Sequence, residues 1–428
     1  MATTPSQVDS HQKQLGAAEW LPLFGVEDRL LLACARQRLT EANADALGVL
    51  LQESIDWAQV IHRARWHRLA GMLFYHLRNP DYSQRVPTQA LEQLKGDYRR
   101  ITARFLYSRS ELSAILMAFE AKTIPVIVLK GAALVGAVYT EPGMRPMSDI
   151  DLLVPDHRVG EAQSTVQYLG YGAAEDDDNR EGHWSLHQHL PKLVRTENPI
   201  VVEVHRHIVR LDSPLAFDIN EFWSRARKTS LGGTSAYLLA PEDLLVHLCL
   251  NFFRDRRFQS ARALCQLCDI AEVIQHYTTL DWGALVKRGE SYGVAGPLAC
   301  SLHLARTLLD APIPEETVRS LAPQMTERDL AAFARQRVVT TRQWVASELV
   351  GPGDPYDGKT MVRAAARRII PTREYMRLHY GNARFGSYVR RLGQAVRLGA
   401  RFVCRPSELN SDLGVDRWMH SLYSGKGT

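Results

Sequence analysis

The sequence predicts an α+β protein that is mostly helical, with a small mixed-sheet core between two helical regions. Apolar residues recur at helical spacing from residue 27 to about 79, and again from Pro241 to about 350. Between these regions, strand-like runs alternate with helices and loops within about 85 residues. The length of 428 residues suits two or three units of ordinary domain size.

The N-terminal part is expected to be a flexible tail, residues 1–22, followed by a helical region, residues 23–121. The tail begins MATTPSQVDSHQKQ, which has neither the basic start nor the apolar core of a secretory signal. DRLLLACARQRL and DWAQVIHRARWHRLAGMLFYHL then have helical periodicity. A further helix is expected over residues 87–120, with an apolar stripe formed by Leu106, Leu112, Ile115, Leu116 and Phe119.

The core is expected over residues 122–232. IPVIVLKG is a short, apolar, β-branched run closed by glycine, which indicates a buried strand. AALVGAVY then indicates a helix, TEPGMRPM a loop, and DIDLLVP a second strand. A helix is expected over residues 158–169, and two more strands around HQHLPKLVR and PIVVEVHRHI.

The remainder is expected to be a helical domain over residues 233–350, a linker over 351–360 and a basic helical extension over 361–428. PEDLLVHLCLNFF opens on proline and acids, as helices do. The linker contains GPGDPYDGK, which is dense in glycine and proline. Asp281 and Trp282 are followed by an arginine, an alanine, a glycine and a leucine at the same offsets as Asp56 and Trp57, which indicates either two comparable helical units or coincidence.

Composition excludes several classes of protein. The hydrophobic fraction of 45% and the charged fraction of 23% argue against global disorder, and the net charge of +5 favours anionic partners only mildly. No stretch reaches the roughly 18 consecutive apolar residues that a membrane span needs. The six cysteines are scattered, which favours a reducing compartment and a cytoplasmic location. Cys265 and Cys268 have zinc-like spacing, but without a second ligand pair we interpret them as a helical pair and assign no metal.

Two aspartates on one strand are the main chemical signal. Asp149 and Asp151 project from the same face, where their mutual repulsion favours a shared Mg²⁺ or Mn²⁺ and phosphate chemistry. Glu203 lies in the middle of an apolar strand, where an unpaired charge would be costly. It completes a three-carboxylate site if its strand lies beside the first; the alternative is a charge on the solvent face of an edge strand.

A turn suited to phosphate precedes these carboxylates. In LKGAAL a strand ends at Lys130 and Gly131, and Ala132 opens a helix whose free amides could face a phosphate. Arg145 and Ser148 lie on the following loop, where they could either touch a triphosphate or brace the turn.

A group of histidines raises the alternative of a zinc site. They lie at strand spacings and have no cysteine among them, so a role in contacting phosphate or acceptor, or in accepting a proton, is favoured over zinc. His205 is the preferred candidate, because it shares a strand face with Glu203. The group consists of His183, His187, His189, His205 and His207.

The extension is strongly basic. From Met361 to Arg405, residues 361–405, it has eleven arginines and one acidic residue, interleaved with aromatic side chains. Even spacing of the aromatics favours an amphipathic helix pair packed on the body of the protein. Nucleic acid is the next candidate partner, and an anionic membrane surface or peptide is the third.

These residues together resemble a known superfamily. LKGAALVGAVYTEPGMRPMSDIDLLV, followed by LGYG, HLPKLV and VEVHRHI, resembles the DNA polymerase β-type nucleotidyltransferases, and more closely a bacterial family of uncharacterised nucleotidyltransferases. The run from Ile124 to His207 is the specific part, and weaker similarity extends over most of the chain. The resemblance implies a polymerase β-like core. It also implies catalytic, metal-binding carboxylates at Asp149, Asp151 and Glu203, and a phosphate-contacting turn at Lys130, Gly131 and Ala132.

The resemblance further implies a cytoplasmic transferase with a nucleoside triphosphate such as ATP as co-substrate. An acceptor hydroxyl, on a small molecule or a peptide, would attack the α-phosphorus, and two metal ions would assist as pyrophosphate leaves. The turn departs from the superfamily, which usually has Gly-Ser or Gly-Gly where this chain has Gly131 and Ala132. The alternative is therefore a catalytically reduced module of the same fold that binds nucleotide or RNA.

Overall fold

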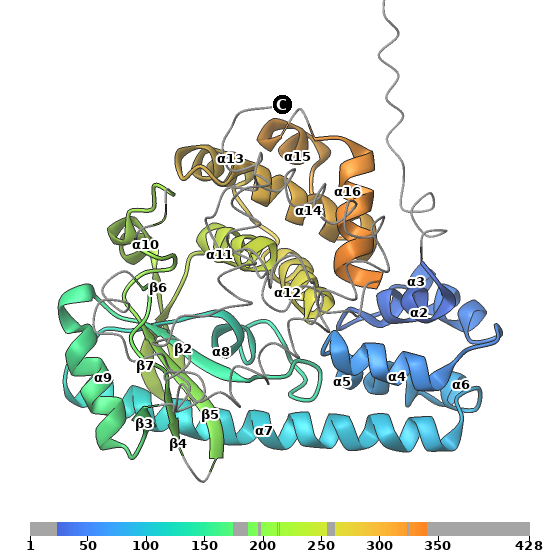
Figure 1. The fold of residues 1–428 in the computed structure, drawn as a ribbon, viewed down its shortest axis with the longest axis horizontal. Coiled ribbons are helices and arrows are strands. Elements are labelled where there is room, and N and C mark those ends of the chain that lie inside the picture. The colour runs from blue at the N-terminus through green and yellow to red at the C-terminus, as the bar shows by residue number, and fades with distance from the viewer. Residues whose placement is uncertain are drawn as a thin grey trace, which may run out of the picture.

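The computed structural model describes residues 24–173, 187–195, 198–211, 213, 215–254, 262–322 and 325–339. The tail, linker and basic extension expected over 1–22, 351–360 and 361–428 lie outside these residues, as does the end of the expected helical domain. The described residues form a mostly helical protein with one mixed sheet (Figure 1), which confirms the predicted fold class.

The sheet has seven strands in the order β3-β4-β5-β2-β1-β7-β6. The pairs β2–β5 and β1–β7 are parallel, and the other neighbouring pairs are antiparallel. It continues past residue 232, the expected end of the core, because the hairpin of β6 and β7 lies beside β1. The strands are β1 (Ile127–Val128), β2 (Asp149–Leu153), β3 (Gly172–Ala173), β4 (Leu193–Arg195), β5 (Asn198–His205), β6 (Arg227–Leu231) and β7 (Thr234–Leu238).

A short helix and a long loop connect β1 to β2. The helix expected from AALVGAVY is α8 (Lys130–Leu134), which ends early. Val135 is extended and Gly136 has a left-handed φ of 111°, a conformation that suits glycine and stops the helix. The loop over residues 135–148 then brings the chain back to the start of β2. Only this helix and loop separate the turn from the two aspartates in the sequence.

Helix α7 (Thr88–Ala121) supports both halves of the molecule. It runs along the lower edge in Figure 1, where it contacts β7 and α9 (Val159–Tyr168) at one end and α4 (Trp57–Trp66) and α5 (Ala70–Leu77) at the other. Of the predicted stripe, Leu112, Ile115, Leu116 and Phe119 are buried in the core of the sheet. Leu106 is 56% exposed, so its inclusion in the buried stripe is wrong. A 3₁₀ turn, η2 (Asp156–Arg158), leads from β2 into α9.

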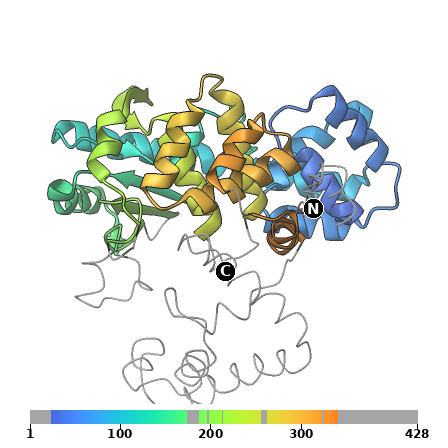
Figure 2. The ribbon, with the colours of Figure 1, turned by 90° about the horizontal axis from the view of Figure 1, so that it is seen from above.

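The helices before and after the sheet share one hydrophobic core. Leu30 and Met72 of the first group lie in the same buried cluster as Leu267 of the second group. The second group lies above the sheet and the first group in Figure 1, and between them in Figure 2. The first group comprises α2 (Val26–Cys34), α3 (Glu41–Leu50), α4, α5 and α6 (Pro80–Ser83). The second comprises α11 (Pro241–Arg254), α12 (Ala263–His276), α13 (Trp282–Ser291), α14 (Ala295–Leu309), α15 (Glu315–Leu321), α16 (Glu327–Ala334) and η4 (Arg335–Val339), with α10 (Ile219–Arg225) before the β6–β7 hairpin.

The repeated sequence pattern corresponds to repeated hydrogen bonds. Asp56 caps α4, and its own amide donates to Glu27 at 3.3 Å. Asp281 caps α13 in the same way, and its amide donates to Glu242 at 3.0 Å. An arginine of each capped helix then pairs with the aspartate that follows each glutamate, Arg63 with Asp28 and Arg288 with Asp243. This shared network favours two copies of one helical unit over coincidence.

Replacing either capping aspartate by alanine is expected to destabilise the protein by the same amount. Each carboxylate accepts one amide hydrogen, from Gln59 in α4 and from Ala284 in α13. Losing such a cap costs about 1 kcal/mol. Urea unfolding of Asp56→Ala and Asp281→Ala measures the cost. The control is Asp45→Ala, at an exposed position within α3, and cap variants no less stable than this control would contradict the equivalence.

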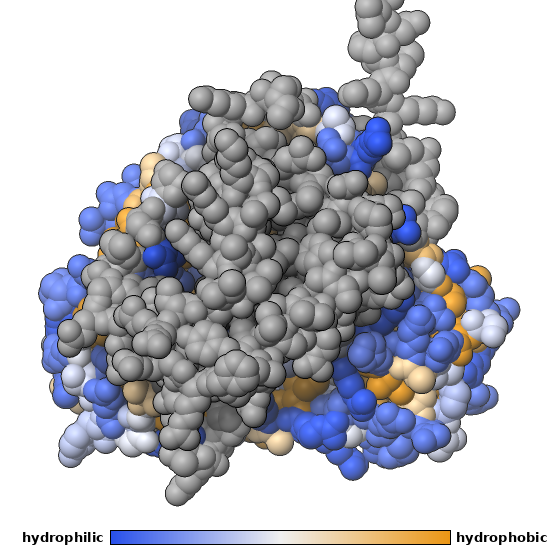
Figure 3. Space-filling model, viewed as in Figure 1, coloured by the Kyte–Doolittle hydropathy of each residue, from blue (hydrophilic) through white to orange (hydrophobic). Residues whose placement is uncertain are grey.

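The surface of the described part is mostly polar. Hydrophilic side chains cover much of the coloured face in Figure 3, with smaller apolar areas between them. None of the helices in the described ranges is long and apolar enough to cross a membrane.

Candidate functional site

Strand pairing places two of the three predicted carboxylates side by side. β2 and β5 are parallel neighbours, and Asp151 is the register partner of Glu203. Both side chains are buried, with exposed fractions of 1% and 7%. Glu203 therefore lies in the interior of the sheet beside β2, and the alternative of a solvent-facing charge on an edge strand is wrong.

Asp151, Glu203 and His205 form a group that could hold a metal ion. One ligand atom from each lies within 4.8 Å of the others. His205 Nε2 lies 2.9 Å from Asp151 Oδ1 and 3.3 Å from Glu203 Oε2. Asp151 Oδ2 is buried and has no hydrogen-bond partner among the described residues. A buried carboxylate oxygen without a donor is costly, so this oxygen fits a cation ligand.

Lys130 supplies the balancing charge. Its Nζ lies 2.6 Å from Asp151 Oδ1. Its backbone has a left-handed φ of 46°. Burial opposes the charged ammonium, but Asp151 and Glu203 outweigh burial and raise the pKa of Lys130. The turn lysine thus points at the carboxylates, and its predicted contact with phosphate stays a prediction.

The same contacts set the charge of the other groups. Burial alone would raise the pKa of both carboxyl groups. The Lys130 charge and the His205 hydrogen bonds instead hold the pKa of Asp151 below its usual value and that of Glu203 well below. Burial alone would lower the pKa of His205, but its hydrogen bonds to the two carboxylates raise it. The site therefore favours two anionic carboxylates, which are the ligands that Mg²⁺ and Mn²⁺ prefer.

Asp149 lies at the edge of this group. It is half-buried at the start of β2, and Ser148 Oγ donates to its Oδ1 at 3.0 Å. Its register partner is Val201, one step of the ladder before Glu203. Asp149 is therefore partly exposed, whereas Asp151 is buried. Its predicted role as a metal ligand stays a prediction.

Arg145 braces the loop. Its Nε and Nη2 donate to the two oxygens of Asp269 on α12, at 3.0 and 2.7 Å, and Tyr139 donates to the same carboxylate at 2.9 Å. A methyl group on Gly131 would lie 2.2 Å from Arg145 Nη1, so only glycine fits beneath the guanidinium. Of the two uses that we predict for Arg145, the structure supports the bracing of the turn.

Gly131 and Ala132 are buried within α8, and this helix has only five residues. The predicted contact of their amides with a phosphate stays a prediction. The absence of a hydroxyl at Ala132 matters less for the local fold, because its methyl group packs in the core of the sheet.

Two further side chains reach Glu203: Lys192, which sequence reasoning left out, and His189, a member of the predicted histidine group. Lys192 Nζ lies 2.8 Å from Oε1, and His189 Nε2 lies 3.9 Å from Oε2. The rings of His187, His189 and His205 follow one another at centroid distances of 5.1 and 5.2 Å. His183 lies outside the described residues. The sequence does show a lysine directly before an apolar strand at Lys192. Only the pairing of β4 with β5 shows that its partner is Glu203.

The charges of the site act on His247, a buried histidine of α11. Burial, followed by the charge of Lys130, lowers the pKa of His247 to about 3. Because the folded pKa lies below the unfolded value of about 6.5, this histidine opposes folding as the pH falls below about 6.5. We expect the free energy of unfolding to fall by roughly 2 kcal/mol more in the wild type than in His247→Gln between pH 6.5 and 5.0.

Urea unfolding at the two pH values checks this expectation for His247. His62 is exposed on α4, so His62→Gln is the control and should follow the wild type. A His247→Gln variant with the same pH dependence as the wild type would contradict the burial argument.

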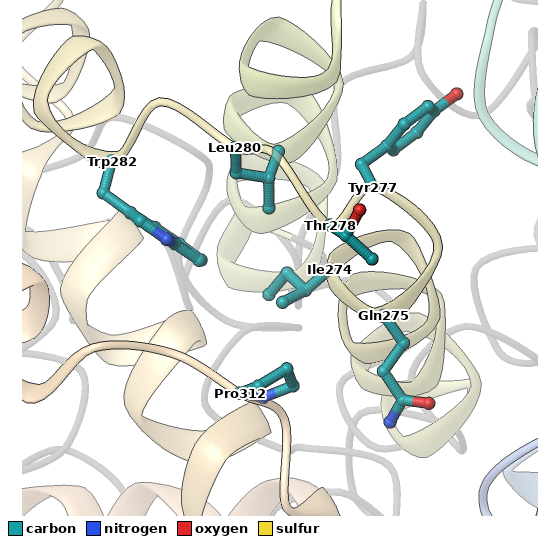
Figure 4. Close-up of a pocket in the computed structure, with 7 residues that line it drawn as sticks. All are labelled: Ile274, Gln275, Tyr277, Thr278, Leu280, Trp282 and Pro312. Carbon is teal, nitrogen blue, oxygen red and sulfur yellow. The ribbon is translucent and has the colours of Figure 1, made fainter.

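The structure has two small cavities of note. One of about 320 Å³ adjoins Ser148 and is lined by Arg65, Arg68, Ala70, Asp97, Ile101, Arg104, Pro146, Met147 and Ser148. The other, of about 210 Å³, lies at the end of α12, the start of α13 and the loop before α15 (Figure 4). Ser148 lines the first cavity and donates a hydrogen bond to Asp149, so the first cavity is the one connected to the site.

Comparison with known proteins places the chain in a family. Residues 53–310, more than half of the chain, match the uncharacterised nucleotidyltransferase family, and the chain belongs to it. A crystal structure described as an antigenic nucleotidyltransferase-like protein from Paracoccidioides brasiliensis matches 49% of this chain and 95% of that chain. The identity is 18% and the TM-score is 0.30. The comparison with curated proteins gave no match.

Proposed function

We propose that the protein is a metal-dependent nucleotidyltransferase of the polymerase β type. It would move a nucleoside monophosphate from a nucleoside triphosphate, such as ATP, to an acceptor hydroxyl on a small molecule or peptide. The observation that carries the proposal is the register of Asp151 with Glu203 on parallel strands, which leaves a buried, unpartnered carboxylate oxygen. Membership in the nucleotidyltransferase family supports it.

The proposed reaction is an in-line displacement at phosphorus. The acceptor oxygen forms a bond to the α-phosphorus, and the bond from that phosphorus to the oxygen bridging to the β-phosphate breaks, so that pyrophosphate leaves. Mg²⁺ or Mn²⁺ held by Asp151, Glu203 and His205, and by Asp149 at the start of β2, would supply Lewis-acid assistance and neutralise charge. Asp151 Oδ2 is open either to ligate that cation or to accept the proton of the acceptor.

The chain's own residues would position the reactants. The Arg145–Asp269 pair fixes the loop that precedes β2, so Ser148 and Asp149 keep their places relative to Asp151. Lys130, held at the carboxylates, provides a positive charge beside the position where a phosphate would approach. Positioning and electrostatics would therefore supply most of the catalysis.

Release of pyrophosphate tests the proposal. The full chain is incubated with Mg²⁺ or Mn²⁺, each of four labelled nucleoside triphosphates and a cell extract as the source of acceptor. We expect metal-dependent pyrophosphate from at least one triphosphate, and mass spectrometry of the labelled product identifies the acceptor. No release from any of the four with either metal would refute transferase activity.

A second candidate function is a catalytically reduced module that binds nucleotide or RNA. The contact of Lys130 with Asp151 favours it, because the ammonium already neutralises the carboxylate that a cation would bind. The two functions differ in one readout. A reduced module would bind a nucleoside triphosphate and release no pyrophosphate.

A further inference from the structure

The 320 Å³ cavity beside Ser148 has the size of a small ligand pocket, for which about 300–1,000 Å³ is usual. It lies between the end of α4, the start of α5, α7 and the loop over residues 146–148. Three arginines line it, Arg65, Arg68 and Arg104, together with a single acidic residue, Asp97. The cavity thus has an excess of positive charge directly beside the residue that precedes Asp149.

The charges of this cavity are only partly compensated. Asp97 pairs with Arg65 at 2.8 Å and also with Arg100, so its charge is shared. Arg68 donates to the neutral hydroxyl of Ser148 at 3.2 Å, and within the described ranges no carboxylate lies within ion-pair distance of it. Burial, followed by the charge of Arg262, lowers the pKa of Arg68 to about 10. A bound anion would relieve this unfavourable accumulation of charge.

Arg68 also occupies a backbone position that suits glycine. Its φ is 60°, in the left-handed region, where a side chain costs about 1 kcal/mol or more. The equivalent residue of the second helical unit is Gly293, with φ of 71°. The same backbone hydrogen bond follows both helices: the amide of Leu69 donates to the carbonyl of Ala64 at 2.7 Å, and the amide of Val294 donates to that of Gly289 at 2.8 Å. An arginine held in a glycine position indicates a role for its side chain.

The side chain of Arg68 is linked to the proposed reaction site. Ser148 Oγ accepts from Arg68 Nη1 and donates to Asp149 Oδ1 at 3.0 Å. We propose that Arg68, which lines this cavity together with Arg104, binds a phosphate-type anion in it, on the opposite side of Ser148 from Asp149. This inference rests on the proposed transferase function for its role in the reaction. The anion would belong either to the terminal phosphates of the nucleoside triphosphate or to an anionic group on the acceptor.

Binding of inorganic phosphate to the full chain tests the proposal, measured by calorimetry. The variant is Arg68→Gly, which matches the residue of the second helical unit and removes backbone strain, so we expect its melting temperature to equal or exceed that of the wild type. Losing one charge-assisted contact should weaken phosphate binding about 10-fold to 100-fold. Arg68→Lys keeps the charge and should retain part of the affinity.

The matched control removes an arginine from the same region. Arg99 is exposed on α7 and does not line the cavity, so Arg99→Ala should bind phosphate as the wild type does. Equal affinity of Arg68→Gly and the wild type would overturn the proposal, as would the absence of phosphate binding by the wild type.

Competition then identifies the source of the anion. If a non-hydrolysable ATP analogue with Mg²⁺ displaces phosphate, the site binds the terminal phosphates of the nucleotide. If both bind together, it binds an anionic group of the acceptor. Phosphate binding that depends on Arg68 without any pyrophosphate release would refute the transferase and leave this anion site standing. Pyrophosphate release without such binding would support the transferase and refute this anion site.

Discussion

Asp149→Asn is expected to abolish nucleotide transfer while the protein stays folded. The carboxylate is half-buried at the start of β2, and its contact with Ser148 can be kept by an amide oxygen. Removing its charge removes the proposed cation ligand at this position, so under the proposed mechanism the rate should fall by at least about 10³-fold. Metal-dependent pyrophosphate release measures the rate, and urea unfolding confirms that stability is retained.

Asp156→Asn is the matched control for this loss of charge. Asp156 follows the end of β2 and its side chain is 70% exposed, so its replacement should leave the rate unchanged. Asp149 is a better test than Asp151, because Asp151→Asn would also leave the half-buried Lys130 without its closest anion. A fully active Asp149→Asn variant with both Mg²⁺ and Mn²⁺ would refute the assignment of this carboxylate.

The carboxylates could be predicted because their signal is local. Alternation in DIDLL and a charge inside VVEVHRHI identify Asp151 and Glu203, and β2–β5 pairing places them opposite each other. The same reasoning gave His205, which does join the group. Asp149 shares a strand face with Asp151. How far Asp149 lies from Asp151, Glu203 and His205 depends on where β2 begins, and the alternation of apolar and polar residues alone does not determine that point.

Other features depend on contacts between distant segments, which the sequence does not reveal. The loop clamp joins Arg145 to Asp269, and Arg68 comes from the turn between α4 and α5, which precedes the core by many residues. The β6–β7 hairpin did have a local signal in Gly232 and Gly233, both left-handed in the turn, but its strands are short and polar. The shared core of the two helical groups is likewise a tertiary result.

Asp269→Asn is expected to lower the free energy of unfolding by about 3–5 kcal/mol, because it leaves the buried Arg145 guanidinium uncompensated. Asp269 is 1% exposed and receives two hydrogen bonds from Arg145 and one from Tyr139. The amide can accept the Tyr139 bond but cannot balance the charge. Urea unfolding measures the loss.

Glu53→Gln provides the control for Asp269→Asn, because Glu53 pairs with Arg29 at 3.0 Å and the two side chains are 40% and 31% exposed. Its replacement should cost less than about 1 kcal/mol. The clamp holds the loop before Asp149, so the folded fraction of Asp269→Asn should also transfer nucleotide about 10²-fold more slowly. A variant as stable as Glu53→Gln would show that the loop does not depend on this pair, whereas loss of stability without loss of rate would show that the clamp does not position the site.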